Sequence, residues 1–581
     1  MKKLFCHTLI VNGEEYMKII NCEGILENYG ACTLNGEYLS GTAEVCDDGD
    51  ISFIKADVRC VFTPYEYARI FEKDNSLEIT VETEEAEKVL AQQLKTPFWT
   101  QPCFSDGFYG MPGKLQYVLI KHNSFYEFIL PVANENFFAT VKGDGRCSYK
   151  ICVSTLSPDN TEICGTVAVV SKASEPYEAI KKGYTAAVKC GIIKTPLKSD
   201  KKYPEILKYL GWCTWNAFYH DVSEEKILAK AKEFKEKNIP VKWILIDDGW
   251  SETDDLYLKS IYEDKNKFPN GLKHTIDILK ETYGIKKVGV WHSATGYWKG
   301  IGNNFESIET CSDIRLPVGY EFYSKWYGYL KEQGVDFIKV DSQGNLIEFL
   351  RNSKNSLEKV FALHDAIERS AEENFDFVIN CMGMCNINMF AHKSSVMLRN
   401  SDDFYPKKTD SLKSHVMQNV YNAVFNDNLF FCDYDMWWSE HFQAEQNAVL
   451  RYISGGPFYL SDEEGRSNAD IIRRFVNDDG QIDICDNAAK PLPECLFGFK
   501  DVLKIYNTRK NSILVAMFTF ENAAQAEIKP EDFGKRGVFT VNDVIKGDTF
   551  TLKDGESLKY KLNSYDVRLL EFIQKEQEAV L

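Results

Sequence analysis

Eight short apolar segments recur through the middle of the chain, and acidic or polar residues follow most of them. Their β-branched and aromatic residues are typical of buried strands. Helical patterns separate most of these segments, and repeated alternation of strand and helix predicts a (β/α)8 barrel. The segments occupy residues 208–216, 241–250, 286–293, 335–341, 376–382, 395–403, 428–436 and 456–462.

Two helical patterns between these segments are especially regular. Residues 222–238 place Ile227, Ala231 and Phe234 on one face and Glu/Lys pairs on the other. Residues 318–334 form the second pattern, which ends at a glycine. The fifth and sixth segments start only 19 residues apart, at 376 and 395, so no full helix is expected between them.

The two ends of the chain carry a different pattern. Up to about residue 170, many apolar and polar residues alternate with a period of two, which predicts an antiparallel β-sandwich. Short strand patterns return after residue 495. We therefore predict a multidomain α/β protein with an N-terminal β-sandwich and its linker helix (1–195), a central (β/α)8 TIM barrel (205–490) and a small all-β C-terminal domain (495–575).

Charge and composition narrow the range of partners. The formal net charge of −18 disfavours nucleic acid and anionic membranes. The chain has no uninterrupted apolar stretch long enough to cross a bilayer. Residues 1–16 are expected to form a first strand and not a signal peptide, so we expect a cytoplasmic protein. The sequence leaves homo-oligomerisation open.

Several kinds of cofactor site are not expected. The 17 cysteines are an odd number scattered through apolar segments, which indicates reduced thiols. The nine histidines form no HxH or HExxH pattern, so no catalytic metal is predicted. The chain also lacks the glycine-rich motifs that bind nucleotides. We expect an enzyme without a cofactor.

Carboxylates gather where the predicted strands end, which is where barrel enzymes place their chemistry. This clustering suggests acid/base or nucleophilic work on a polar, uncharged substrate. The carboxylates are Asp247 and Asp248 after the second strand, Asp341 at the end of the fourth, Asp402 and Asp403 after the sixth, and Asp435 after the seventh.

The fourth strand carries a lysine and a carboxylate two residues apart, Lys339 and Asp341. Residues with this spacing point to the same side of a strand. A neighbouring lysine favours the ionised carboxylate that a glycosidase nucleophile needs. A buried structural ion pair would give the same pattern, and the sequence leaves both interpretations open.

Arg399 precedes two adjacent carboxylates, Asp402 and Asp403. Repulsion between them can raise the pKa of one, as an acid catalyst requires. An Asp-rich turn before Pro406 is the alternative. Asp247 and Asp248 allow hydrogen bonds to sugar hydroxyls or a helix cap.

Tryptophans near strand ends suggest a wall for a sugar, although buried Trp more often belongs to the core. Trp215 and Trp291 are the candidates. Trp212 lies three residues before Trp215, so the two would face opposite sides of a strand, and Trp215 lies nearer the strand end.

Six motifs, taken together, resemble the raffinose synthase and alkaline α-galactosidase (seed imbibition protein-like) branch of glycoside hydrolase family 36. They occur in the same order as in that family, and the N-terminal stretches PFWTQPCF, LQYVLI and SEPYEAIKKGY are also similar to it. The resemblance covers nearly the whole chain. The six motifs are GWCTWNAFY, LIDDGW, VWHSATGYW, IKVDSQGN, RNSDDFYP and DYDMWWSEH followed by GGPFYLSD.

The resemblance implies a retaining mechanism with Asp341 as the nucleophile. Asp403, four residues after Arg399, would be the acid/base, with Asp402 as its close competitor. The remaining positions would bind the substrate or shape the −1 pocket. Asp247 and Asp248 would hold O4 and O6 of galactose, Lys339 and Arg399 would bind hydroxyls, Cys381 would contact the 2-substituent, Trp215 and Trp291 would shape the pocket, and Asp435 would orient other groups.

We therefore predict a retaining α-galactosidase that acts on small soluble α-galactosides. Two departures from the plant enzymes place transfer to sucrose in doubt: Asn216 replaces the aspartate of the plant motif, and the segment after LIDDGW is compact. A galactosyltransferase and an α-N-acetylgalactosaminidase remain alternatives of the same class. A catalytically dead sugar-binding protein is the alternative of a different class.

Overall fold

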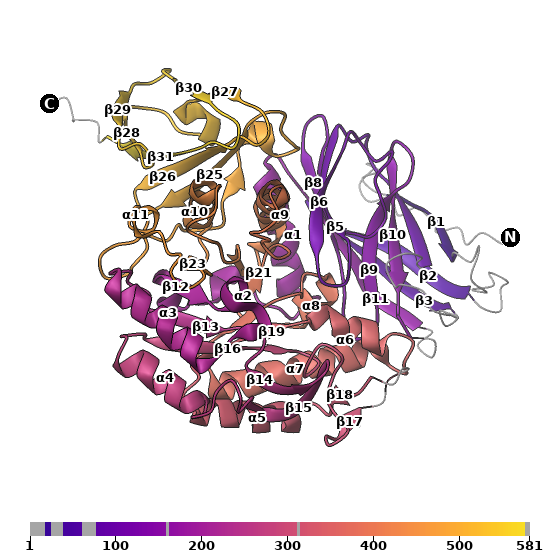
Figure 1. Ribbon diagram of the computed structural model, residues 1–581. Coiled ribbons are helices and arrows are strands. Elements are labelled where there is room, and N and C mark those ends of the chain that lie inside the picture. The colour runs from indigo at the N-terminus through magenta and orange to yellow at the C-terminus, as the bar shows by residue number, and fades with distance from the viewer. Residues whose placement is uncertain are drawn as a thin grey trace.

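The computed structural model describes residues 18–24, 39–60, 77–157, 162–308, 310 and 314–575. An antiparallel sheet, a parallel sheet surrounded by helices and a second antiparallel region follow one another along the chain (Figure 1). This arrangement confirms a multidomain α/β protein. The strand expected within residues 1–16 lies outside the described residues.

The eight central apolar segments each contain one strand of a single parallel sheet. Its order is β22-β21-β20-β19-β16-β13-β12-β23, and a parallel bridge between Trp437 and Leu460 connects the segment after β22 to β23. The strands are β12 (Gly211–Cys213), β13 (Trp243–Ile246), β16 (Lys287–Ser293), β19 (Phe337–Asp341), β20 (Val378–Asn380), β21 (Met397–Arg399), β22 (Phe431–Asp433) and β23 (Tyr459–Leu460).

Helices connect most of these strands. Ser223 caps the first long helix by accepting a hydrogen bond from the backbone of Lys226. Between β20 and β21 only the six-residue helix α8 (Asn386–Ala391) forms, as the short spacing predicts. The others are α2 (Trp215–Phe218), α3 (Glu224–Glu236), α4 (Leu272–Glu281), α5 (Tyr320–Glu332), α6 (Gln343–Leu350), α7 (Ser356–Asn374), α9 (Ser411–Asn426), α10 (Ala444–Tyr452) and α11 (Ala469–Ile472).

Alternate residues of the parallel strands face two different cores. Trp243, Leu245 and Phe337 belong to a small cluster, whereas their neighbours Ile244 and Ile338 pack into a much larger one. Two glycines make room for the aromatic rings of the small cluster. A Cβ at Gly211 would lie 2.1 Å from the ring of Trp243, and one at Gly289 would lie 2.3 Å from Phe337.

The N-terminal region forms one branched sheet of eleven antiparallel strands. Its central strands are buried on both faces: Val118 and Ile120 belong to the sheet's own core, whereas Leu119 joins the large cluster shared with the helices around the parallel sheet. The strands are β1 (Lys18–Gly24), β2 (Leu39–Asp48), β3 (Ile51–Cys60), β4 (Leu77–Glu82), β5 (Lys88–Leu94), β6 (Thr100–Ser105), β7 (Leu115–Lys121), β8 (Tyr126–Pro131), β9 (Phe138–Gly143), β10 (Ser148–Ser154) and β11 (Glu162–Ala173).

Helix α1 (Pro176–Lys189) leads from this sheet to the parallel strands and packs on β8 and β11. After the parallel sheet, two antiparallel sheets surround a separate core that contains Val515, Val541 and Phe572. Their strands are β24 (Lys490–Pro491), β25 (Leu503–Arg509), β26 (Ser512–Phe518), β27 (Ala524–Ile528), β28 (Phe539–Asp543), β29 (Thr549–Leu552), β30 (Leu558–Leu562) and β31 (Val567–Gln574).

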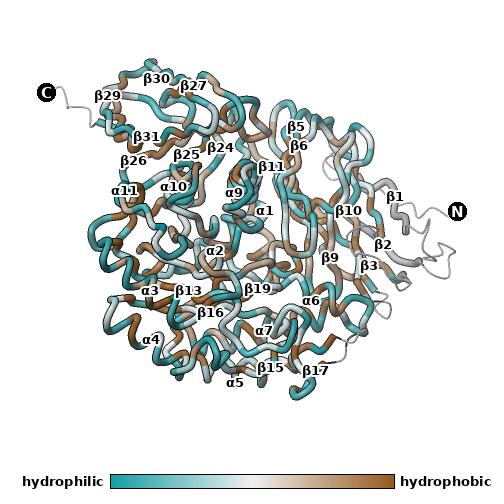
Figure 2. The backbone as a smooth tube through the Cα atoms, in the orientation of Figure 1, coloured by the Kyte–Doolittle hydropathy of each residue, from teal (hydrophilic) through white to brown (hydrophobic). Residues whose placement is uncertain are grey.

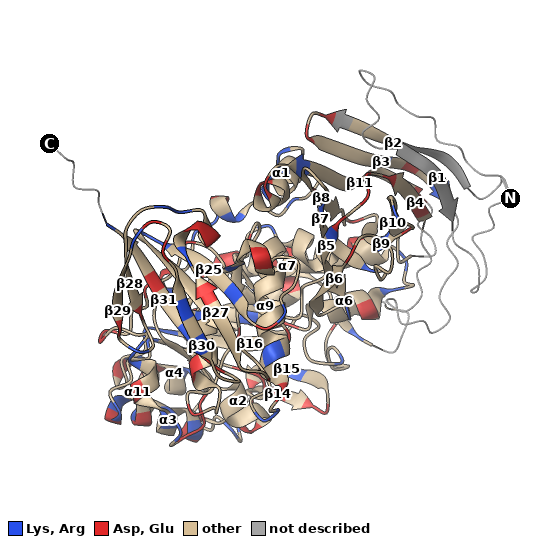
Figure 3. Ribbon diagram, turned by 90° about the horizontal axis from the view of Figure 1, so that it is seen from above, with Lys and Arg blue, Asp and Glu red and all other residues tan. Residues whose placement is uncertain are grey.

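Hydropathy and charge follow this layout. Hydrophobic residues mark the central strands β13 and β16 (Figure 2). Basic and acidic residues are interspersed along the strands and helices, and the N-terminal sheet and the C-terminal strands lie on different sides (Figure 3). The described cysteines are free thiols. Within the part of the chain that the structure describes, no helix is long and apolar enough to cross a membrane.

Candidate active site

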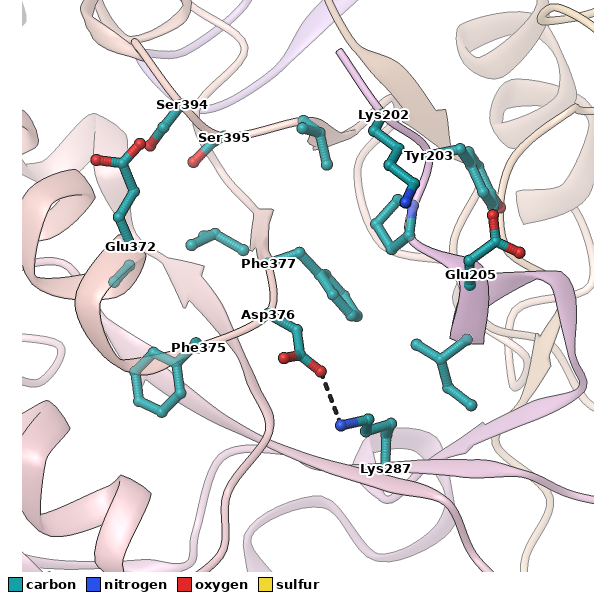
Figure 4. A pocket seen from close by; sticks show the side chains of 15 residues that line it. Lys202, Tyr203, Glu205, Lys287, Glu372, Phe375, Asp376, Phe377, Ser394 and Ser395 are labelled. Atoms are coloured by element: carbon teal, nitrogen blue, oxygen red, sulfur yellow. Dashed lines mark ion pairs between the residues drawn. The ribbon is translucent and has the colours of Figure 1, made fainter.

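The carboxyl ends of the parallel strands carry one connected group of polar side chains. Most of the residues that the sequence analysis selected contact another selected residue, or its neighbour in the chain, through hydrogen bonds, ion pairs or ring contacts. Asp402 and Trp215 are the exceptions. At the opposite ends of β16, β20 and β21 lies a cavity of about 630 Å³. It contains the Lys287–Asp376 ion pair and none of the selected residues (Figure 4).

Asp341 ends β19 and is only 6% exposed. Its Oδ2 accepts a hydrogen bond from Trp291 Nε1 at 2.8 Å, and its Oδ1 accepts one from the Ser342 backbone N–H at 2.6 Å. Burial raises the pKa of Asp341, while the charge of Lys339 and the bond from Trp291 lower it. Both direct donors lack an acceptor function, so they favour the ionised carboxylate.

Lys339 lies on the same side of β19 as Asp341, but its hydrogen bond goes elsewhere. Its Nζ donates to Asp247 Oδ2 at 2.8 Å, and both side chains are buried. Asp247 Oδ1 accepts from the Asp248 backbone N–H at 2.9 Å. Lys339 therefore forms a buried ion pair with Asp247 and influences Asp341 through its charge.

Asp248 has one oxygen without a partner. Trp298 Nε1 donates to its Oδ2 at 2.8 Å, and His220 Nε2 lies 3.0 Å from the same atom. This hydrogen bond raises the pKa of His220. Among the described residues, none pairs with the buried Oδ1. A buried carboxylate oxygen needs a donor, and a sugar hydroxyl can supply it.

Arg399 is fully buried and connects the carboxylates that follow β21 and β22. Its Nη2 donates to Asp403 Oδ1 at 3.0 Å, and its Nη1 lies 3.0 Å from Asp435 Oδ1 and 3.7 Å from Cys381 Sγ. Asp403 keeps 35% of its side chain exposed. Burial raises the pKa of Asp435 to about 6 against the opposing charge of Arg399. Burial likewise raises the pKa of the Cys381 thiol, so it stays protonated at neutral pH.

Two side chains hold the loop that carries Asp403. The Phe404 backbone N–H donates to Asp435 Oδ2 at 2.7 Å, and its carbonyl accepts from Asn216 Nδ2 at 3.3 Å. A carboxylate at position 216 could not donate this second bond. Asn216 thus has a positioning contact, and Asp435 contacts both Arg399 and the loop.

Asp402 and Asp403 occupy different surroundings. The Asp402 backbone N–H donates to Gln418 Oε1 at 2.9 Å, and burial raises the pKa of its side chain, with repulsion from Asp403 adding to the shift. Asp403 pairs with Arg399, and its charge also raises the pKa of Asp341. Asp403 therefore differs from Asp402 in its contact with Arg399 and in the effect of its charge on the predicted nucleophile.

Trp212 and Trp215 occupy different surroundings, but Trp215 lies on helix α2 and not on the strand, so the expected strand spacing does not apply to it. Trp212 is fully buried and packs against Phe218 and Phe234 outside the strands. Trp215 begins α2, is partly exposed and meets the ring of His220 edge-on. Trp291 packs beside Trp298, with 5.7 Å between their ring centroids.

Sequence reasoning missed His220 and Trp298. Trp298 ends the motif VWHSATGYW, and His220 directly follows GWCTWNAFY, but nothing in their spacing indicates that they meet at Asp248.

A buried hydrogen-bonded network supports the turn after Asp341. Gln343 Nε2 donates to Asn380 Oδ1 at 2.7 Å, which leaves Gln343 Oε1 as the acceptor for His392 Nε2 at 3.1 Å. The other ring nitrogen of His392 lies 3.0 Å from Glu368 Oε1, so both ring nitrogens act as donors. Glu368 also accepts the backbone N–H groups of Ser394 and Ser395.

Replacing Glu368 by Gln should destabilise the fold in a pH-dependent way. Burial alone would raise the pKa of Glu368, but its bonds with His392, Ser394 and Ser395 hold that pKa well below the usual range. A depressed pKa stabilises the fold above the unfolded carboxyl value of about 4.3 and ceases to do so as the pH falls. We expect E368Q to lower the free energy of unfolding by roughly 2–4 kcal/mol at neutral pH.

Denaturant unfolding at about pH 7 and about pH 3.5 checks this expectation. The cost of E368Q should be smaller at the lower pH. Glu372→Gln, at an exposed position on the same helix, is the matched control and should change little at either pH. An equal cost of E368Q at both pH values would contradict the ionic role of Glu368.

Within the described ranges, no group of three or more His, Cys, Asp or Glu residues could hold a metal ion. A probable galactinol–sucrose galactosyltransferase of Arabidopsis thaliana is 29% identical over 69% of this chain and 60% of its own length. Stachyose synthase of Pisum sativum is 22% identical over 70% of this chain and 65% of its own.

The chain thus aligns with about 60% of the length of these curated relatives. Solved structures show a similar fold at low identity. A GH36 α-galactosidase of Geobacillus stearothermophilus in complex with raffinose has a TM-score of 0.59 at 12% identity, covering 92% of this chain and 81% of its own. The α-galactosidase of Lactobacillus brevis has the same TM-score and identity, covering 97% and 86%.

A family model described as raffinose synthase or seed imbibition protein Sip1 matches residues 114–265 and 314–580, which is well over half of the chain. The expected family is confirmed by this match and by the order of the motifs around Asp341 and Arg399. The chain belongs to the raffinose synthase/seed imbibition protein family.

Proposed function

We propose that this protein transfers α-galactosyl groups between small sugars through a covalent intermediate on Asp341. The proposal rests on the contrast between the surroundings of two carboxylates, Asp341 and Asp403. Asp341 is buried and held by two N–H donors, whereas Asp403 is partly exposed and paired with Arg399. A nucleophile must stay ionised, and an acid/base must exchange protons with the substrate.

In the first step, Asp403 gives a proton to the glycosidic oxygen of the donor, and an Asp341 oxygen attacks the anomeric carbon. The bond to the leaving sugar breaks as the ester bond to Asp341 forms, so the galactosyl group has the β configuration. In the second step, the Asp403 carboxylate takes a proton from an acceptor hydroxyl. The acceptor oxygen then attacks the anomeric carbon, releases Asp341 and restores the α configuration.

The charges around the site favour a neutral substrate. Lys339 and Arg399 are already paired with Asp247, Asp403 and Asp435, so neither cation is left for a substrate anion. The unpartnered Oδ1 of Asp248 accepts a hydrogen bond and cannot donate one. A sugar hydroxyl can donate this bond. Asp247 and Asp248 therefore remain the proposed galactose-binding residues.

Transfer is better supported than the hydrolysis that we expected from the sequence. The relatives quoted above are named as a galactosyltransferase and a synthase, and their alignments cover 69% and 70% of this chain. The motif differences are confined to Asn216 and to the segment after LIDDGW. Asn216 donates a hydrogen bond to the Phe404 carbonyl, so its amide has a positioning contact in the loop that carries Asp403. Hydrolysis is the second candidate, because water can replace the acceptor in the second step.

The architecture behind this chemistry is part of the proposal. We propose that the eight parallel strands form a closed (β/α)8 barrel, with the Trp437–Leu460 bridge at the seam. The domain limits proposed are 1–195, 205–490 and 495–575. Chemistry at the carboxyl ends of the strands accords with such a barrel.

A panel of donors and acceptors tests the proposed function. We expect galactinol and raffinose to be cleaved, with galactose transferred to sucrose in preference to water. The corresponding α-glucoside and α-N-acetylgalactosaminide should react poorly. Release of free galactose alone would favour the hydrolase. Binding of galactosides without turnover would favour a catalytically dead scaffold.

A further inference from the structure

The tip of the hairpin between β5 and β6 reaches the face where the parallel strands end. The tip, residues 95–99, is held by its own hydrogen bonds. The Lys95 backbone N–H donates to the Trp99 carbonyl at 3.0 Å, and Thr96 Oγ1 accepts the backbone N–H groups of Phe98 at 3.2 Å and Trp99 at 3.1 Å. A tip fixed in this way presents its side chains in one arrangement.

The tip contacts the segments that follow strands β19 and β20. The Met384 backbone N–H, three residues after Cys381, donates to the Phe98 carbonyl at 3.3 Å. Gly344, three residues after Asp341, meets the tip directly, because a Cβ there would lie 2.3 Å from the Phe98 ring and 2.7 Å from the Pro97 carbonyl. A side chain at position 344 would therefore push the tip away from the site.

Trp99 is the tip residue that contacts Arg399, the hydrogen-bond partner of the candidate acid/base Asp403. Its ring centroid lies 5.8 Å from Arg399 Cζ, within the range of a cation–π contact. The same guanidinium holds Asp403. Trp99 is partly exposed, as is most of β6, which follows it. The exposed part of this indole, which shares the Arg399 guanidinium with Asp403, is available to a ligand.

We infer that Trp99 forms a wall of the subsite for the leaving group and the acceptor, and that it binds a hexose ring by stacking. This inference rests on the proposed function. The acid/base must reach the glycosidic oxygen, so the sugar on the far side of that oxygen lies next to Asp403. Indole faces pack well against the C–H faces of a sugar. The N-terminal sheet thus supplies a specificity-determining residue to a site built by the parallel strands.

The inference separates two kinds of donor. A donor with a sugar leaving group uses both subsites, whereas an α-galactosyl fluoride uses only the galactose subsite. Trp99→Ala should lower kcat/KM for raffinose roughly 10-fold to 100-fold and leave hydrolysis of the fluoride within about threefold. With sucrose as the acceptor, the ratio of transfer to hydrolysis should fall, because sucrose binds by stacking on Trp99 and water does not. Trp99→Phe should retain part of both properties.

Tyr109→Ala is the matched control, because Tyr109 is an aromatic residue of the same sheet that is 83% exposed. It should behave as wild type. An equal loss with the fluoride and raffinose in W99A would overturn the inference, and so would no loss with either. If W99A does not fold, Trp99→Leu provides the same comparison. A wild-type protein that turns over neither donor would refute the proposed function and, with it, the role of Trp99.

Discussion

Asp341→Ala should abolish turnover of every α-galactoside donor, with a loss of about 10⁴-fold or more. The reason is that no other carboxylate can take its place: Asp247 is engaged with Lys339, and Asp403 with Arg399. Initial rates with an aryl α-galactoside and with raffinose measure the effect. Asp478→Ala, at an exposed position, is the matched control and should keep the wild-type rate.

The smaller variant Asp341→Gly turns this loss into a positive result. Azide can enter the space left by the carboxylate and attack the anomeric carbon from the same side. With an activated aryl donor, the product should be the β-galactosyl azide. Formation of the α-galactosyl azide would contradict the role of Asp341, and so would full activity of Asp341→Ala.

The parallel strands could be predicted because each one combines an apolar run with polar residues at its end. Even the short connection before β21 follows from the spacing, since a helix of only six residues fits there. The same reasoning places Asp341, Arg399 and Asp247 at one end of the sheet. Local pattern carries this information because strand direction alone decides which end a residue occupies.

Partners across the site could not be predicted in the same way. Lys339 bonds to Asp247 on β13, although β16 lies between β13 and β19 in the sheet. That contact depends on how side chains cross the interior, where the glycine at 289 leaves room for large neighbours. No spacing along one strand encodes it.

Contacts between distant regions were even harder to predict from the sequence. Trp99 belongs to the N-terminal sheet, and its position over Arg399 requires the close approach of Phe98 to Gly344. Glu368 and His392 each lie among other polar residues in the sequence, and their bond appears only when α7 packs beside the segment after α8. Such contacts arise from packing between elements, which a single sequence specifies only indirectly.

Asp403→Ala should slow donors with poor leaving groups by about 10²-fold to 10⁴-fold, because the leaving oxygen loses its proton donor. An activated aryl donor should lose much less in the first step, since its leaving group departs without a proton. Rates with raffinose and with the aryl donor measure the difference. Asp402→Ala is the matched control: Asp402 has the same side chain one position earlier but no contact with Arg399, and it should not show this dependence.

The two carboxylates can then be assigned by the products that azide gives with each variant. In Asp403→Ala the ester to Asp341 still forms, so azide attacks it from the opposite face and yields the α-galactosyl azide. In Asp341→Gly no ester forms, and the expected product is the β anomer. Opposite anomers from the two variants require one nucleophile and one acid/base in the assigned order. If Asp402→Ala gives the α azide and the leaving-group dependence while Asp403→Ala gives neither, the acid/base is Asp402, and the contact between Arg399 and Asp403 is structural.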